Sequence, residues 1–276
     1  MCMKKKLLTF ALLLAGLTGV YGQSNGTLTV ANIKNAVPGY RGSLDLVLTS
    51  ENLYAAYQFD ITLPEGLTYE GYADGPLING HTPPTISGTT YKRFTGAAFP
   101  SANFTGKTGT LLTIYFTVSA SATGTLTGGS LSGIHFSDID AMDYAMSDHS
   151  FSVPVSNTVT LSENATQPPA AISGVNVTVE RTLKSGVWNT IVLPFDMTDT
   201  QVTNTFGEGT QIGEFDNYDV TGSQISVKFK AVDAIAAHTP YIIKVTEAKS
   251  SFSVSGVTIT EATADTNGRF LTVNHG

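Results

Sequence analysis

An alternating stretch from Ala55 to Leu63 places the strongest constraint on how this chain folds. Apolar residues occupy every second position, and the positions between them hold small or polar residues. A period of two is typical of a β-strand with one face in a core and the other in water. Pro64-Glu65-Gly66 follows directly, and proline and glycine favour the end of a strand and a turn. The stretch therefore predicts a fold built on β-sheets.

Further short segments repeat this alternation along the first half of the chain. We expect strands at residues 27–33, 44–49, 91–95, 110–119 and 151–155, with more short strands within 124–136. Glycine-containing turns separate these segments, and no long helical period occurs. The pattern predicts an all-β fold, a Greek-key β-sandwich of the immunoglobulin-like kind, over residues 23–157.

A segment without periodicity, residues 158–173, separates the expected sandwich from the rest of the chain. It carries Pro168 and Pro169 and is expected to be a short linker. Alternation resumes in residues 174–276, which predict a second, smaller β-rich domain. The sequence ends just after an expected strand at residues 270–273, so we expect this second domain to be incomplete.

One short helix is expected in the second domain, from Thr198 to Phe206. Thr198 is a favourable N-cap, and Gln201 three positions later completes the pattern of a capping box. Gly207 follows, and glycine commonly ends a helix. The strands expected around this helix cover residues 175–179, 187–193, 225–229, 241–245, 252–254 and 257–259.

The N-terminus has the pattern of a secretory signal peptide, expected over residues 1–22. A run of three lysines precedes an apolar stretch from Leu7 to Val20, which is short for a membrane span. We therefore expect a bacterial protein that is secreted, at the cell surface or in the periplasm, without membrane insertion after cleavage. The single cysteine, Cys2, would leave with the signal peptide, which excludes disulfides and thiolate catalysis in the mature chain.

The charge balance disfavours two classes of partner. The whole chain has 15 basic and 22 acidic residues, a net charge of −7, and removal of the signal peptide takes away three lysines. An acidic mature protein is not expected to bind nucleic acid or anionic lipid.

An acidic segment between two expected strands is the place where metal-ligating side chains crowd together. Asp138, Asp140 and Asp143 could supply oxygen ligands to calcium, but they lack the glycine and the distal glutamate of an EF-hand loop. A zinc site that includes His135 and His149 is the less favoured alternative. We interpret the segment as a solvated acidic loop, and no cofactor is expected.

No arrangement of residues in the sequence predicts catalysis. A G-x-S-x-G motif is absent, and the five histidines are scattered along the chain. Glycoside hydrolysis needs two facing carboxylates, and nothing in the sequence pairs any two of the acidic residues. We therefore expect that the protein is not an enzyme.

Residues 27–155 resemble the cohesin-like modules of anaerobic bacteria, which share a Greek-key sandwich with several families of carbohydrate-binding module. The likeness rests on residues 55–67, which include AAYQFDI and LPEGL, and on residues 106–118, GKTGTLLTIYFTV. Residues 174–276 resemble a β-rich module of secreted proteins of gut bacteria, through RTL and WNTIVLPF within residues 181–195.

The resemblance to cohesins implies a module that binds another protein. Cohesins bind dockerins, which are paired calcium-loop helices, across one face of a sheet. In the family, outward positions of the strand that matches residues 54–62 usually offer side chains such as Asn and Asp. Here Ala56 and Gln58 occupy those positions.

We expect binding through the outward faces of residues 54–62 and 110–118, together with the loop at 97–106. The side chains expected to line this surface are Tyr54, Gln58, Asp60, Phe99, Phe104 and Tyr115. The favoured function is protein–protein recognition or adhesion, with an unknown protein as partner. The alternative is binding of a polysaccharide, with the aromatic rings as a stacking platform. A glycan-processing enzyme is expected least.

Overall fold

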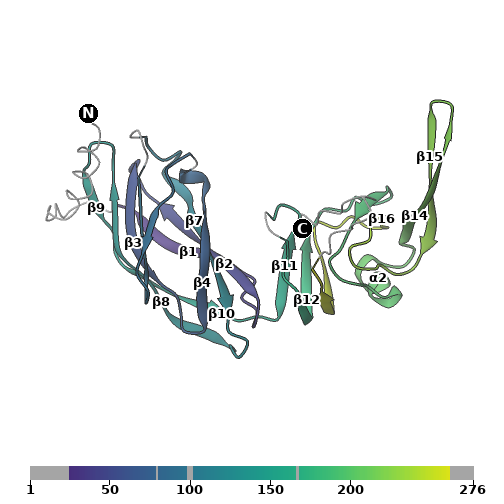
Figure 1. Cartoon of the computed structure of the whole chain (residues 1–276), viewed down its shortest axis with the longest axis horizontal. Helices are drawn as coiled ribbons and strands as arrows, with labels where there is room; N and C mark the ends of the chain where they lie inside the picture. Colours follow the sequence, from purple (N-terminus) through teal and green to yellow (C-terminus); the bar gives the residue numbers. More distant parts are fainter. Residues whose placement is uncertain (1–24, 79, 98–101, 166–167, 262–276) are drawn as a thin grey trace, which may run out of the picture. The chain divides into compact units, whose positions relative to one another are not determined.

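The computed structural model describes residues 25–78, 80–97, 102–165 and 168–261. The chain divides into two compact units, Met1–Val155 and Ser156–Gly276 (Figure 1). The expected signal peptide and the expected strand at 270–273 lie outside the described residues. Within the described residues, no helix is long and apolar enough to cross a membrane.

The first unit is a sandwich of two antiparallel sheets (Figure 1). One sheet has the order β1-β2-β7-β4, with strands Thr27–Lys34, Arg41–Thr49, Thr108–Val118 and Leu67–Asp74. The other has the order β10-β8-β3-β6-β5, with strands His149–Pro154, Thr125–Ser137, Ala56–Thr62, Lys92–Ala97 and Thr85–Ser87. A short strand, β9 (Asp143–Ala145), pairs with β8, and a 3-10 turn, η1, covers Pro76–Ile78. The predicted all-β class and its sandwich are confirmed.

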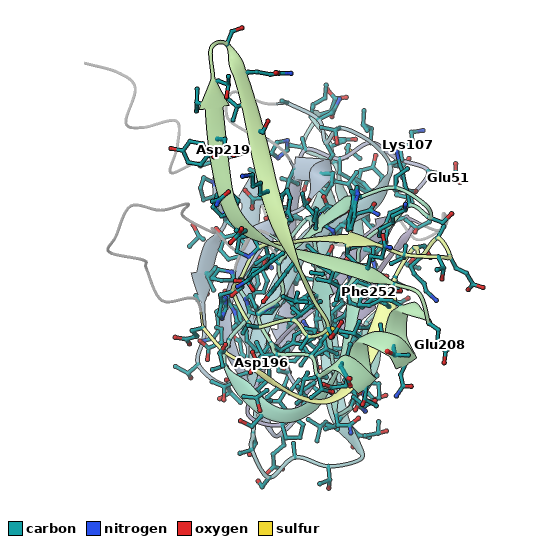
Figure 2. The ribbon with its side chains drawn as sticks, turned by 90° about the vertical axis from the view of Figure 1, so that its right-hand side faces the viewer. Glu51, Lys107, Asp196, Glu208, Asp219 and Phe252 are labelled. Atoms are coloured by element: carbon teal, nitrogen blue, oxygen red, sulfur yellow. The ribbon has the colours of Figure 1, made fainter. Side chains whose placement is uncertain are left out.

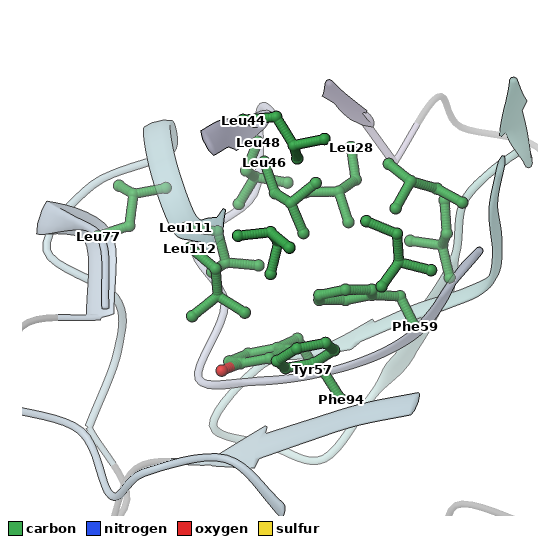
Figure 3. Packing of buried hydrophobic residues seen from close by; sticks show 14 of the residues in the cluster. Leu28, Leu44, Leu46, Leu48, Tyr57, Phe59, Leu77, Phe94, Leu111 and Leu112 are labelled. Atoms are coloured by element: carbon green, nitrogen blue, oxygen red, sulfur yellow. The ribbon is translucent and has the colours of Figure 1, made fainter. Parts of the chain in front are cut away.

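The core of the first unit lies between the two sheets, where alternation sends every second side chain inward. Leucines of β1, β2 and β7 face the aromatic rings of β3 and β6 (Figure 3). Phe59 and Phe94 stack at 5.3 Å between ring centroids. Gly96 is required beside this stack, because a β-carbon there would lie 2.4 Å from the ring of Tyr57.

Two features of the first unit differ from the sequence prediction. Residues 67–74 form the edge strand β4, which we did not expect, because Gly71 interrupts its alternation with a bulge. Residues 125–137 form one long strand, β8, rather than two short ones. Both strands contain glycines, which weaken the pattern of alternation without preventing sheet pairing.

The second unit contains two smaller sheets and one α-helix in its described part (Figure 1). The first sheet has the order β11-β12-β17, with strands Thr158–Ser162, Ile172–Glu180 and Phe252–Ile259. The second has the order β13-β16-β14-β15, with strands Asn189–Ile191, Tyr241–Lys244, Gln211–Thr221 and Gln224–Val232. The predicted linker is wrong over Thr158–Ser162, because β11 pairs in parallel with β12.

The predicted helix is confirmed as α2, Asp199–Phe206. Thr198 and Gln201 form the capping box, in which each side chain bonds to the backbone of the other residue. Gly207 follows at the C-cap. Phe206 is buried and packs edge-on against Phe252 of β17, with 4.9 Å between ring centroids. The apolar side of the helix is therefore fixed to the three-stranded sheet.

A candidate recognition face on the first unit

The central strand β3 presents polar side chains on its outer face. β3 lies between β8 and β6, so each outward side chain has a cross-strand neighbour on both sides. Gln58 is paired with His135 of β8 and with Thr95 of β6. We call the outward residues Gln58, Asp60, Arg93, Thr95 and His135 the central polar face. Because the inward residues of β3 are buried in the core, this face is held on a rigid sheet.

An ion pair fixes one side of the central polar face. Arg93 donates from Nε to Oδ1 of Asp60 at 2.6 Å and from Nη2 to Oδ2 at 2.7 Å. The Asp60 side chain is 15% exposed and the Arg93 side chain 41% exposed. The hydrogen bond to Asp60 raises the pKa of the Arg93 guanidinium above its ordinary value. The guanidinium also lies 5.8 Å from the ring centroid of Tyr91.

A histidine–aspartate pair fixes the other side. Nδ1 of His135 lies 2.9 Å from Oδ2 and 3.1 Å from Oδ1 of Asp143, which belongs to β9. Gln58 therefore lies between the Asp60–Arg93 pair and the His135–Asp143 pair. Each pair holds a charged or polar group in a defined direction before any partner arrives.

The acidic segment after β8 forms a turn. Asp138 accepts hydrogen bonds from the backbone N–H groups of Asp140 and Met142, each at 3.0 Å, and from the hydroxyl of Tyr144 at 2.9 Å. The segment joins β8 to β9. Asp138 stabilises this turn because its side chain accepts hydrogen bonds from backbone N–H groups of the turn.

Two of the residues considered as ligands for calcium or zinc make hydrogen bonds to other groups of the protein. Asp138 bonds within its turn and Asp143 bonds to His135. Among the described residues, no group of three or more His, Cys, Asp or Glu side chains is arranged to hold a metal ion. Asp140 is exposed, and His149 lies on β10, opposite Leu131.

Two of the aromatic residues predicted at the surface are in the core. Tyr54 is 0% exposed and Phe104 is 3% exposed, so their assignment to a binding surface is wrong. The Tyr54 hydroxyl donates to the carbonyl of Asn25, and its backbone carbonyl accepts from the N–H of Phe104. Both rings contact Phe136, which shows why they are buried: the loop packs onto the end of the core. Phe99 lies outside the described residues.

Tyr115 faces outward as expected, but on the other sheet. It belongs to β7, whereas Gln58 and Asp60 belong to β3. The Arg41 guanidinium lies over the Tyr115 ring, 4.5 Å from its centroid. The prediction of one surface that joins the two strands is therefore wrong, because their outer faces lie on opposite sides of the sandwich. Alternation tells which residues point outward but not which sheet holds a strand.

Sequence reasoning missed Arg93, Thr95 and His135 as members of the face. The information that identifies them is the strand register, which pairs Arg93 with Asp60 and His135 with Gln58. The long connections between these strands do not specify register in the way a two-residue hairpin turn does.

Comparison with known proteins gives matches among solved structures alone. No protein-family model and no curated protein sequence matches the chain. A non-cellulosomal cohesin from Archaeoglobus fulgidus is 15% identical, with a TM-score of 0.38, and the match covers 48% of this chain and 91% of that one. The sixth cohesin of scaffoldin B from Acetivibrio cellulolyticus, solved in complex with a dockerin, is 17% identical, with a TM-score of 0.42. The match covers 48% of this chain and 99% of that one.

A third match is the cohesin module of a family 33 glycoside hydrolase from Clostridium perfringens. It is 11% identical, with a TM-score of 0.40, and the match covers 48% of this chain and 98% of that module. These structures are cohesin modules, the family that residues 27–155 resemble in sequence.

Proposed function

We propose that the first unit is a non-catalytic recognition module that binds a partner protein through the central polar face. The observation that carries this proposal is the position of Gln58 on β3, between the strands that hold two pairs of hydrogen-bonded side chains. Polar groups that are already oriented cost little entropy on binding and discriminate between partners by charge.

Two exposed apolar residues stand beside this face and suit a protein partner. Ile139 and Met142 lie in the turn between β8 and β9, and both are exposed. Apolar side chains next to oriented polar groups are the usual composition of a protein-binding surface. A dockerin-bearing protein is the partner class that the resemblance in sequence implies.

The aromatic residues argue against the carbohydrate alternative. Sugar rings stack on flat, exposed aromatic side chains. Tyr54 and Phe104 are buried, and Tyr115 lies on the opposite sheet under Arg41. In the described part of the first unit, Tyr91, which directly precedes β6, is the exposed aromatic residue. A single ring at the edge of the face is a poor platform for a polysaccharide.

We also infer that the protein is exported, since residues 1–22 have the pattern of a signal peptide. The recognition face would then meet its partner outside the cytoplasm, at the cell surface or in the periplasm.

The test compares two lysine substitutions on opposite sheets. Gln58→Lys changes the centre of the face, and Val47→Lys changes an outward, half-buried position of β2 on the other sheet. The immobilised protein is used to capture partners from the secreted proteins of the producing bacterium and from a panel of dockerins. Capture that is lost in Gln58→Lys and kept in Val47→Lys supports the proposal.

Equal capture by both variants would overturn the assignment of the site. Depletion of the protein by insoluble polysaccharide, with no protein captured, would favour the carbohydrate alternative instead.

A further inference from the structure

The strands β14 and β15 extend beyond their sheet as a two-stranded ribbon. β14 pairs with β16 over Gln211–Glu214, whereas its pairing with β15 continues to Thr221 and Gln224. In the described part of the chain, residues 215–221 therefore have β15 as their one neighbouring strand. The ribbon projects from the second unit in Figure 1, and Asp219 marks it in Figure 2.

Strand register places all the large apolar side chains of the ribbon on one face. Tyr218 is paired with Val227, and Val220 with Ile225. Phe215 is paired with Phe229, and their rings meet edge-on. We call this set the apolar ribbon face: Phe215, Tyr218, Val220, Ile225, Val227 and Phe229.

A β-bulge in β14 brings Phe215 and Tyr218 to the same face of the ribbon. Phe215 and Tyr218 are three positions apart, so regular alternation would put them on opposite faces. The register shifts between Phe215 and Asn217, and one extra residue on β14 returns Tyr218 to the face of Phe215.

The opposite face of the ribbon is charged and internally paired. Lys228 bonds to Asp219 at 2.5 Å, and Lys230 bonds to Glu214 at 3.3 Å. The ribbon thus has one charged face and one apolar face, although no further layer covers either of them among the described residues.

The apolar ribbon face is unusually exposed for its composition. The exposed fractions of its members range from 41% for Phe215 to 67% for Ile225. A two-stranded hairpin is marginally stable in water by itself, and a contiguous exposed apolar patch marks an interaction site. The ribbon is therefore expected to have a covering partner.

We propose that a second copy of this chain covers the apolar ribbon face, with two ribbons packed face to face about a twofold axis. From the exposed fractions, each ribbon would bury roughly 600 Å², given about 150–250 Å² for a whole aromatic side chain. Two ribbons together would bury about 1,200 Å², which reaches the lower bound of stable protein–protein interfaces.

Charge also favours a second copy. A twofold axis brings each surface against itself, and the apolar ribbon face has no charged member that would meet its own copy. The charged residues stay on the outer sides, where water solvates them. A membrane surface is a poorer occupant, because the chain has a net charge of −7 and anionic lipid would repel it.

The test measures the oligomeric state of the full-length mature chain by sedimentation equilibrium over a range of concentrations. Ile225→Lys places a charge within the proposed interface, near the tip of the ribbon, and Ser226→Lys places the same charge on the opposite face. We expect a dimer for the unchanged chain and for Ser226→Lys. Ile225→Lys should raise the dissociation constant by roughly 100-fold, because a buried unpaired charge is costly.

A loss of folding would not account for that result, because Ile225 is among the most exposed apolar residues of the chain. Circular dichroism spectra of the three proteins should agree, which would show that each of them is folded. A chain that stays monomeric to roughly 100 µM, where even a weak dimer would form, overturns the proposal. So does a dimer that persists in Ile225→Lys, or flotation of the chain with vesicles of neutral phosphatidylcholine.

Discussion

The carboxylate of Asp60 accepts two parallel hydrogen bonds from the guanidinium of Arg93 across the neighbouring strands β3 and β6. These two hydrogen bonds fix the direction of both side chains on the outer face of the sheet. The Arg93 side chain remains 41% exposed, so water screens the attraction between the charges. The pair therefore contributes more to the orientation of side chains on the central polar face than to the stability of the fold.

Asp60→Asn tests this interpretation. We expect the free energy of unfolding to fall by less than about 1 kcal/mol, the usual range for exposed ion pairs. Affinity for a captured partner should fall by about tenfold, because Arg93 loses its fixed direction and must be ordered on binding. Urea unfolding and a binding titration provide the two measurements. A loss of more than about 3 kcal/mol would show that the pair is a structural element instead.

Tyr57→Phe is expected to stabilise the first unit. The Tyr57 hydroxyl is buried and has no hydrogen-bond partner among the described residues, and burial raises its pKa above the ordinary value. Removal of an unpaired buried hydroxyl should add about 1 kcal/mol to the free energy of unfolding. Tyr54→Phe is the matched control and should lose about 1 kcal/mol, because its hydroxyl donates to Asn25. Equal losses in both variants would show that Tyr57 does have a partner.

Gly96→Ala is expected to destabilise the first unit by about 1–3 kcal/mol, the usual cost of overpacking. The new β-carbon would lie 2.4 Å from the ring of Tyr57, which is confined between the sheets. Thr95→Ala, next along β6 but facing outward, should change stability by less than about 0.5 kcal/mol. In a Tyr57→Leu background the cost of Gly96→Ala should shrink, as thermal melts can show. An unchanged cost would exclude the ring as its cause.

Tyr144→Phe is expected to show a defined pH dependence. The hydrogen bond to Asp138 raises the pKa of Tyr144 from its ordinary value of 10.0, since the bond requires the protonated hydroxyl. The stabilisation is therefore complete below pH 10.0 and is lost as pH rises through the raised pKa. The stability difference between the unchanged protein and Tyr144→Phe should be constant from about pH 7 to 9 and should shrink above about pH 10. Urea unfolding at each pH measures it, and a difference that grows at high pH would contradict the assignment.

Several elements could be predicted because their local sequence agrees with their final environment. β3 alternates cleanly, and β7 does so from Leu112 to Val118, since each lies inside a sheet with one buried face. The helix α2 has its capping residues within four positions of each other, so its start needs no tertiary information. For these elements the local and the global preferences coincide.

Other features depend on distant parts of the chain. The sequence shows that Gln58 and Tyr115 point outward, but the assignment of β3 and β7 to different sheets follows from pairing alone. Arg93 meets Asp60 through a register that no short turn specifies. The sequence pattern suggests that Tyr54 is exposed, but the loop at Phe104 packs over it in the folded chain. The alternation of residues 225–229 is regular, but residues 215–220 look irregular because a bulge in β14 hides their single apolar face.

The separation of β3 and β7 into opposite sheets has a consequence for how this module can change over evolutionary time. Substitutions at Gln58 and at Tyr115 share no contacts, so their effects on free energy are expected to add. The side chains of one outer surface can therefore change while those of the other stay the same. The shared interior between the sheets supports both, and it is there that a single change would affect the two surfaces together.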